Sequence, residues 1–336
     1  MDLHIIDQIP DRLLEISSNK LHEILPGPTL LRIPGEKKPP FFISTLLHGD
    51  EPTGFLAMQQ LLSRCSQQKK RLPRSVWLFL GNISAARENV RHLPGQPDFN
   101  RIWKGGPLPE HRVVEQILKI LKSNPPFAGV DIHNTSGKNP HYACVNKLDG
   151  PFINLGKLFS SMIVYFTRPD EVISRALAEF CPAITIESGQ AYDPFGVNHV
   201  LGFLELCLVL DTIPTNTNEP TEPKVYHSIA RIEVPDHCRI GFGESCQNTD
   251  FNFIENLESM NFVLQAENTL VGWRRNPDLK LAVIDEQSED VSEGFISYTN
   301  EEIRLIRSVV PSMLTTLAPN ILDDCLGYLM QRYVLD

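Results

Sequence analysis

The stretch PFFISTLLHGDEPTG (residues 40–54) decides the fold, because an apolar run, Pro40 to Leu47, leads directly into a polar loop. Such a run is typical of a buried strand. Similar runs follow at SVWLFLG (75–81), GVDIH (129–133), SMIVYF (161–166) and AITIE (183–187). Segments with apolar residues at every third or fourth position separate them, at 54–65, 110–122, 170–180 and 195–210. The alternation predicts an α/β fold: a doubly wound, mixed and largely parallel sheet with helices on both faces.

A polar segment, TIPTNTNEPTEPK (212–224), divides the chain, because it contains almost no large apolar residue and is rich in Pro, Thr and Asn. We therefore predict a first domain over 1–213, a linker over 214–223 and a smaller β-rich domain over 224–336. Short strand-like runs in that second domain lie at 225–234, 262–265, 281–284 and 294–298. Helical spacing from Pro319 onward predicts a terminal helix.

Charge and composition exclude several classes of function. The 336 residues include 41 acidic and 31 basic ones, a net charge of -10, so the field of the protein would repel nucleic acid and anionic membranes. The longest apolar stretch, Leu201 to Leu210, contains Glu205 and is too short to span a membrane. Asp2, Asp7 and Asp11 stand where a signal peptide would carry positive charge, which predicts a cytoplasmic protein.

The cysteines argue against two kinds of stabilising site. Seven cysteines are an odd number, and no two of them form a CxxC pair. A disulfide framework and a cysteine-based zinc site are therefore both disfavoured.

Polar residues that follow the predicted strands point to a metal site. His48 and Glu51 lie just beyond one strand, and His133 ends another. In an open α/β sheet, ligands bind at the carboxyl ends of strands. Two imidazoles and one carboxylate are the protein ligands of many catalytic zinc sites. Alternatively, Glu51 only begins a helix. Asp131 faces the same way as His133, so it can orient that ring or remain an ordinary strand-end residue.

A second carboxylate ends another predicted strand. Glu187 ends the run AITIE (183–187), and an isolated acidic residue after an apolar run suggests a functional role. As a general base, it would take a proton from a water molecule and pass it to a leaving amine. The alternative is a glutamate that is merely solvated at the rim of the sheet.

The long loop NISAARENVRHLPGQPDFNR (82–101) carries Arg87, Arg91, Asn100 and Arg101 beside this predicted site. Arginine binds carboxylates through two hydrogen bonds, so Asn100 and Arg101 are candidates to hold an acidic substrate. Arg91 is a candidate to stabilise the oxyanion formed when a carbonyl is attacked. The alternative is a set of solvated arginines, and that alternative is strongest for Arg87.

Four motifs in this order resemble the aspartoacylase and succinylglutamate desuccinylase family of the zinc carboxypeptidase superfamily. They are HGDEPTG (48–54), LGNISA through DFNRIW (80–103), DIHNTSG (131–137) and TIESGQAYDPFG (185–196). A further stretch, KVYHSIARIEVP (224–235), resembles the family's β-domain. The resemblance implies a zinc-carboxypeptidase-like fold for the first domain.

The resemblance also implies roles for individual residues. It assigns one Zn²⁺ per chain to His48, Glu51 and His133, general acid/base catalysis to Glu187, and polarisation of the scissile carbonyl to Arg91. Asn100 and Arg101 would bind the substrate's carboxylate. Arg175 is the candidate for a further substrate contact, and Arg168 competes with it.

The resulting hypothesis is a zinc-dependent hydrolase that cleaves the amide bond of a small acidic N-acyl amino acid, a carbon-nitrogen bond other than a peptide bond. One alternative keeps the metal but changes the substrate: a carboxypeptidase acting on C-terminal peptide or poly-amino-acid bonds. Another alternative is a non-catalytic protein that binds a metal or ligand on the same fold. The sequence predicts neither a nucleic-acid nor a membrane partner, and it leaves a homodimer open.

Overall fold

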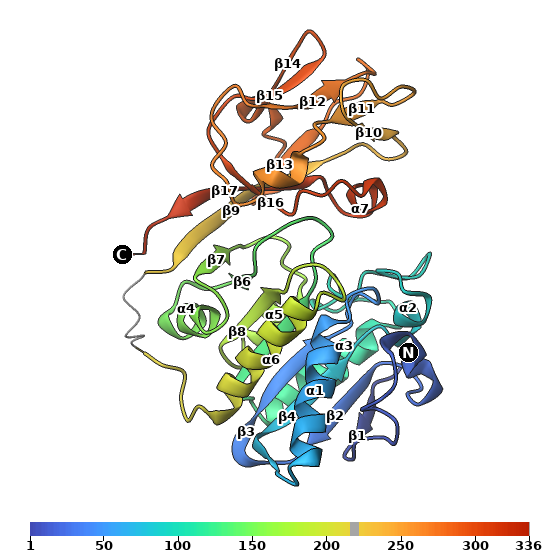
Figure 1. The fold of residues 1–336 in the computed structure, drawn as a ribbon, viewed down its shortest axis with the longest axis vertical. Coiled ribbons are helices and arrows are strands. Elements are labelled where there is room, and N and C mark those ends of the chain that lie inside the picture. Colours follow the sequence, from blue (N-terminus) through green and yellow to red (C-terminus); the bar gives the residue numbers. More distant parts are fainter. Residues whose placement is uncertain (216–221, 336) are drawn as a thin grey trace. The chain divides into compact units, whose positions relative to one another are not determined.

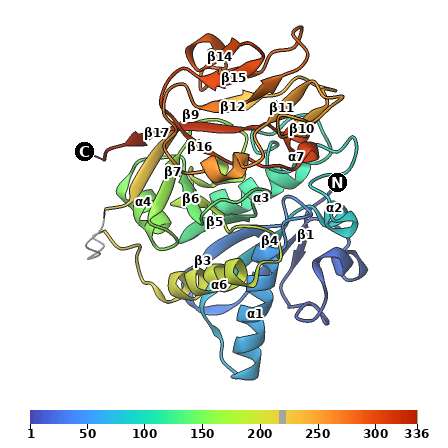
Figure 2. The same cartoon turned by 45° about the horizontal axis from the view of Figure 1, so that its top comes forward.

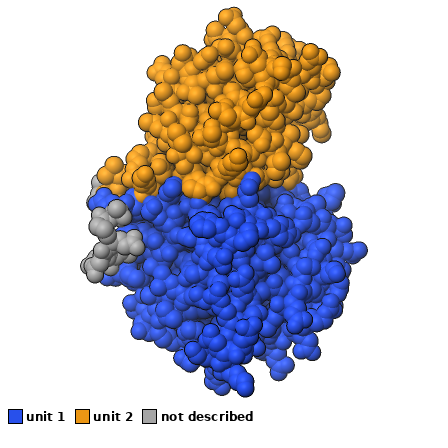
Figure 3. Space-filling model, in the orientation of Figure 1, with its two compact units in different colours: residues 1–134, 141–165, 169–223 blue, residues 135–140, 166–168, 224–336 orange. Residues whose placement is uncertain are grey.

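A computed structural model describes residues 1–215 and 222–335, and the chain divides into two compact units. The first unit comprises residues 1–134, 141–165 and 169–223, and the second comprises 135–140, 166–168 and 224–336 (Figure 3). The predicted linker, 214–223, includes residues 216–221, which lie outside the described part of the chain. The extent of that linker therefore stays a prediction.

A mixed sheet forms the centre of the first unit (Figure 1). Its strands lie in the order β1 (His4–Ile6), β2 (Thr29–Ile33), β4 (Leu72–Leu80), β3 (Gly35–Thr45), β5 (Ala128–His133), β8 (Ala183–Glu187), β6 (Tyr142–Val145) and β7 (Met162–Tyr165). The central strands β4, β3, β5 and β8 are mutually parallel, whereas β2 and β6 run antiparallel to their inner neighbours. The predicted mixed and largely parallel sheet is confirmed.

Helices cover both faces of this sheet. They are α1 (Thr53–Gln67), α2 (Ile83–Glu88), α3 (His111–Ser123), α4 (Gly150–Lys157), α5 (Ile173–Leu177) and α6 (Pro194–Val209), with a 3₁₀ helix at Ser18–Glu23. The helices α1 and α6 pack against each other (Figures 1 and 2). On the opposite face, α3 and α5 share a core with β3 and β4, in which Val113, Ile117 and Leu177 pack with Phe42 and Phe79.

Gly54 explains how α1 lies so close to the sheet. A Cβ atom at this position would stand 2.5 Å from Thr45 Oγ1 and 2.9 Å from Ile132 Cβ. Only glycine fits such an approach without displacing a neighbour. The first turn of α1 is thereby held directly over the ends of β3 and β5, next to Glu51.

Two sequence expectations for the first unit need correction. Residues 83–88 of the predicted long loop form α2, because the side chain of Asn82 accepts a hydrogen bond from the Ala85 amide and caps the helix. Asn89 ends that helix in the left-handed conformation, with φ of 53°. The helix predicted over 170–180 is shorter, Ile173–Leu177, and follows a Val172 residue with extended backbone.

The second unit is β-rich. One group of strands pairs antiparallel: β9 (Lys224–Glu233) lies between β13 (Ala282–Asp285) and β17 (Gly327–Tyr333), and β17 also pairs with β16 (Val310–Ser312). A second sheet has the order β10 (Ile240–Phe242), β11 (Phe251–Phe253), β12 (Leu270–Arg274), β15 (Glu302–Leu305) and β14 (Ile296–Thr299). Short helical turns occur at Leu257–Met260, Ser292–Gly294 and α7 (Ala318–Asp323). Phe251, Phe253, Val283 and Leu329 contribute to one core.

Two predictions for the second unit were wrong. The run at 262–265 is not a strand: Phe262 has φ of 58°, and Gln265 makes only an isolated bridge with Val309. The predicted terminal helix is limited to Ala318–Asp323, and Gly327–Tyr333 is strand β17. Pairing of this segment with β9 along its whole length overrides the helical spacing of its apolar residues.

Within residues 1–215 and 222–335, no helix combines the length and the apolar character that crossing a membrane requires.

Candidate active site

Three potential metal ligands meet at one edge of the first unit's sheet. His48 follows β3, Glu51 precedes α1, and His133 is the last residue of β5. Because β3 and β5 pair in parallel, their carboxyl ends lie at the same edge. His48 and His133 are 3% and 4% exposed, so both imidazoles are shielded from bulk water. The predicted proximity of these three residues is confirmed.

The Glu51 carboxylate joins the two histidines. Its Oε1 lies 2.8 Å from His48 Nδ1, and its Oε2 lies 2.7 Å from His133 Nδ1. The two ring centroids are 4.8 Å apart, and one ligand atom from each residue lies within 4.8 Å of the others. The three ligand atoms are thus close enough together to hold one metal ion.

The far nitrogen of each imidazole has its own carboxylate partner. His48 Nε2 lies 3.0 Å from Asp98 Oδ1, and His133 Nε2 lies 2.6 Å from Asp131 Oδ2. A histidine that donates its Nε2 proton to a carboxylate presents the Nδ1 lone pair to a metal. The donor set therefore fits a divalent cation, and the reach of Asp131 to His133, one of its two predicted roles, is observed.

The charges of the cluster favour a cation beside the Glu51 carboxylate. Burial lowers the pKa of His133, but Asp131 and Glu51 outweigh it and raise that pKa well above its usual value. Burial likewise raises the pKa of Glu51, yet the two imidazoles hold it well below its usual range. Glu51 is therefore ionised and carries the negative charge that a cation requires.

Asn134 holds the Glu51 carboxylate in place through a hydrogen bond. Its backbone amide donates to Glu51 Oε2 at 3.1 Å. Its side-chain amide donates to Thr53 Oγ1 at 2.8 Å and to the Gly189 carbonyl at 2.9 Å. The loop after β5, the start of α1 and the turn after β8 are thus tied together by one buried side chain.

Glu187 is the last residue of β8 and lies in register with His133 on the neighbouring strand β5. The residue is 9% exposed, and its Oε2 has no hydrogen-bond partner within the described chain. Burial is the main cause that raises the pKa of Glu187 to about 8. A carboxylate with such a pKa can both accept and release a proton near neutral pH.

The arginine loop (residues 89–101) is connected to the cluster through Asp98. Arg91 donates to Asp98 Oδ2 from Nη2 at 2.8 Å, while the other oxygen of Asp98 faces His48. Burial opposes ionisation of Asp98, but His48, Arg91 and Arg101 hold its pKa well below the usual range. The backbone amide of Gly49 donates to the Arg91 carbonyl at 3.2 Å, which fixes the start of the loop.

Asn100 is buried against the second histidine. Its Nδ2 lies 3.2 Å from His133 Nε2, and its Oδ1 accepts a hydrogen bond from the Ile173 amide at 3.1 Å. Arg101 donates from Nη1 to the Asn100 carbonyl at 3.0 Å. The structure thus places both residues beside the cluster, and their contact with a substrate stays a prediction.

The remaining candidate arginines lie in different surroundings. Arg175 belongs to α5, whose first residue, Ile173, contacts Asn100. Arg168 belongs to the second unit, where its Nε donates to the Glu286 carbonyl at 3.3 Å. Arg87 is largely exposed and pairs with Glu88 beside it, in agreement with the alternative of a solvated side chain.

Sequence reasoning missed three contributors: Asp98, Asn134 and Ser188, whose hydroxyl donates to the His133 carbonyl at 2.6 Å. Asp98 opens the stretch DFNR and Asn134 follows the third ligand directly, so both lay inside motifs already singled out. Their partners among the potential metal ligands, His48 for Asp98 and Glu51 for Asn134, are distant along the chain, and no spacing rule connects them.

The chain is similar in fold to several solved structures. Succinylglutamate desuccinylase from Chromobacterium violaceum shares 15% identity at a TM-score of 0.55, with 88% of this chain and 85% of that chain covered. Murine aminoacylase 3 shares 13% identity at a TM-score of 0.58, with 89% and 97% covered. The ectoine utilization protein EutE (DoeB) from Ruegeria pomeroyi shares 12% identity at a TM-score of 0.53, with 91% and 83% covered.

Sequence comparison with curated proteins finds no match. The model of the succinylglutamate desuccinylase/aspartoacylase catalytic domain, in contrast, matches residues 37–208, more than half of the chain. This range includes the three potential metal ligands, the arginine loop and Glu187. The chain therefore belongs to the succinylglutamate desuccinylase/aspartoacylase family, whose name describes hydrolytic deacylases.

Proposed function

We propose that this protein is a zinc-dependent hydrolase that cleaves the amide bond of a small acidic N-acyl amino acid. The observation that carries the proposal is the Glu51 carboxylate, which lies between the Nδ1 atoms of His48 and His133 at 2.8 and 2.7 Å. Family membership supports the same reaction class. When bound, zinc would supply Lewis acidity that activates a water molecule and polarises the carbonyl.

Glu187 is the proton carrier in this proposal. Its buried Oε2, which lacks a hydrogen-bond partner within the described residues, is the atom that accepts a proton from the attacking water. The water oxygen forms a bond to the amide carbon, the carbon-nitrogen bond breaks, and Glu187 returns the proton to the leaving amine. The pKa of about 8, caused mainly by burial, suits both transfers.

Arg91 is proposed to stabilise the negative charge that develops on the carbonyl oxygen. Asp98 holds its guanidinium at 2.8 Å, and the Arg91 side chain remains partly exposed. A positioned cation aimed at a developing oxyanion lowers the barrier. Because Asp98 also contacts His48, the same carboxylate orients the arginine and a metal ligand.

The substrate's carboxylate is proposed to bind at Asn100 and Arg101, with Arg175 as a further contact. Support comes from position: Arg101 donates to the Asn100 backbone, and α5, which carries Arg175, begins at the Asn100 side chain. A guanidinium can bind a carboxylate with two parallel hydrogen bonds. This arrangement favours substrates with an acidic amino-acid or acyl part.

The Glu187→Gln variant tests the mechanism. Glutamine keeps the shape of the side chain but cannot accept the proton, so we expect kcat on N-acyl amino acids to fall by a factor of about 10²–10⁴ with zinc still bound. The matched control is Glu179→Gln, which removes an exposed glutamate of the same unit. Full activity of Glu187→Gln would contradict the mechanism.

A substrate panel separates the proposal from its alternatives. N-acetyl, N-succinyl and longer N-acyl derivatives of aspartate and glutamate are compared with peptides that end in the same residues. Preference for the N-acyl amino acids supports the deacylase, whereas preference for peptides supports a carboxypeptidase. Stoichiometric zinc without turnover of either set would favour a non-catalytic binding protein.

A further inference from the structure

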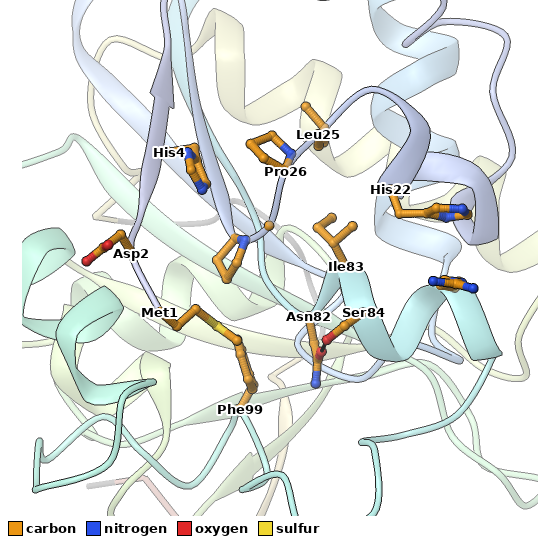
Figure 4. A pocket seen from close by; sticks show the side chains of 13 residues that line it. Met1, Asp2, His4, His22, Leu25, Pro26, Asn82, Ile83, Ser84 and Phe99 are labelled. Atoms are coloured by element: carbon orange, nitrogen blue, oxygen red, sulfur yellow. Dashed lines mark hydrogen bonds between the residues drawn. The ribbon is translucent and has the colours of Figure 1, made fainter.

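A cavity lies in the first unit beside the N-terminal segment. It encloses about 400 Å³ between the first residues of the chain, the turn before β2 and the start of α2 (Figure 4). A volume of this size suits a small organic molecule. The metal ligands His48, Glu51 and His133 do not line the cavity, so it is distinct from the candidate active site.

The lining combines an apolar wall with polar side chains and the guanidinium of Arg87. Leu25, Pro28, Ile83 and Phe99 are buried and contribute apolar surface. Figure 4 shows the side chains of His4 and His22 on the N-terminal segment and Phe99 at the other side of the cavity. The polar part of the lining comprises the carboxylate of Asp2, the imidazoles of His4 and His22 and the guanidinium of Arg87.

The guanidinium of Arg87 keeps hydrogen-bonding capacity for a ligand. Arg87 pairs with Glu88 through Nε at 3.2 Å, and both side chains are more than half exposed. An exposed ion pair of this kind contributes little to stability, so the terminal guanidinium nitrogens of Arg87 can bind an anion.

The cavity wall is continuous with the arginine loop. Phe99 lies between Asp98, which contacts His48, and Asn100, which contacts His133. On the same wall, Asn82 donates to Gln96 at 2.9 Å, and Gln96 donates to Ser84 at 3.3 Å. Occupancy of the cavity would therefore act on both ends of residues 96–100.

We propose that this cavity binds a small carboxylate with a flat apolar body, and that the bound molecule steadies residues 96–100 and thereby the positions of Asp98 and Asn100. The carboxylate would lie at Arg87, and the apolar body would lie against Phe99 and Ile83. The cavity would be a regulatory site for an organic acid. The binding part of this inference does not depend on the proposed deacylase activity.

Binding of benzoate tests the site, with uncharged benzamide as the matched ligand. Gly27 offers a way to fill the cavity: an added Cβ would stand 3.7 Å from the nearest atom, His4 Cδ2, which is ordinary contact. We expect titration calorimetry to show benzoate binding at least tenfold weaker in Gly27→Phe and about threefold or more weaker in Arg87→Gln. Benzamide should bind more weakly than benzoate to the unmodified protein.

Two controls carry the same substitutions elsewhere. Gly294→Phe adds the aromatic ring where no atom lies within 4 Å of the new Cβ, and Arg112→Gln removes an exposed arginine of α3. Both should bind benzoate like the unmodified protein. Failure of the unmodified protein to bind benzoate, or equal binding by Gly27→Phe, would overturn the proposed site.

Hydrogen exchange tests the coupling to the arginine loop. The Asn100 amide donates to Asp98 Oδ1 at 2.6 Å, and the Arg101 amide donates to the Asp98 carbonyl at 2.9 Å. Saturating benzoate should slow exchange of these amides at least threefold in the unmodified protein and not in Gly27→Phe. Unchanged exchange despite benzoate binding would overturn the coupling, and this readout requires neither a substrate nor catalysis.

Discussion

Asp98 shows how much of the proposed chemistry depends on a single carboxylate. One of its oxygens faces His48 Nε2 at 3.0 Å, and the other accepts from Arg91 at 2.8 Å. The residue also accepts a hydrogen bond from the Asn100 amide. A proposed metal ligand, a proposed oxyanion contact and a proposed substrate contact are therefore positioned by the same side chain.

The Asp98→Asn variant should bind zinc about 10–100-fold more weakly, because loss of an orienting carboxylate reduces the basicity of the His48 ligand. Competition with a fluorescent zinc chelator measures the affinity. Asp149→Asn is the matched control, since Asp149 is exposed and makes no side-chain capping bond. Equal zinc affinity of Asp98→Asn and the unmodified protein would refute the orienting role.

Asp250 gives the second unit a stability that depends on pH. Hydrogen bonds from the Arg239 side chain and backbone lower its pKa to about 2. The carboxylate thus has a lower pKa in the folded chain than in the unfolded chain, near 3.9. Its contribution is fully present above about pH 4 and is lost as the pH falls toward 2.

The Asp250→Asn variant should lose about 1 kcal/mol of unfolding free energy at pH 7, and this difference should shrink below about pH 4. Urea unfolding of both proteins at a series of pH values measures it. Asp278→Asn, at an exposed position of the same unit, should show no such dependence. A difference that stays constant down to pH 2 would contradict the assignment to this carboxylate.

At the scale of elements, the proposed centre depends on how closely α1 lies against β3 and β5. Glu51 precedes the helix, and His48 and His133 follow the strands, so the spacing of these elements sets the spacing of the ligands. Gly54 makes the approach feasible, because any Cβ at that position would overlap Thr45 and Ile132. The conformational cost of glycine in a helix is therefore offset by packing at this position.

Two glycine-to-alanine changes are expected to shift the free energy of unfolding in opposite directions. Gly54→Ala should destabilise the protein by about 1–3 kcal/mol through overpacking, although alanine is the better helix former. Gly202→Ala in α6, where no atom lies within 4 Å of the new Cβ, should stabilise it by about 0.5–1 kcal/mol. Thermal unfolding compares them, and stabilisation by Gly54→Ala would contradict the packing described for α1.

At the scale of the whole molecule, the sequence predicted the central strands and the clustered ligands, because each depends on a local apolar run ending in a polar residue. His48, His133 and Glu187 are of this kind. The role of Asp98 could not be predicted in this way, since its partner His48 is distant along the chain. The same holds for Gly327–Tyr333, which becomes a strand only by pairing with β9.

The unit to which each segment belongs could not be fully predicted from the sequence either. Residues 135–140 and 166–168 group with the second unit although they precede it in the sequence by many residues. The Asn261 side chain, for example, donates to the Lys138 carbonyl at 3.0 Å. Contacts between such distant segments follow from the folded chain and leave no pattern in local composition.

The measurement that tests the central claim most directly is zinc content by plasma mass spectrometry, for the unmodified protein and for His48→Ala with His133→Ala. We expect about one zinc per chain in the unmodified protein and nearly none in the double variant. The control, His22→Ala with His237→Ala, should retain the metal. Absence of zinc from the unmodified protein after zinc is supplied, or full retention by the double variant, would contradict a zinc site at His48, Glu51 and His133.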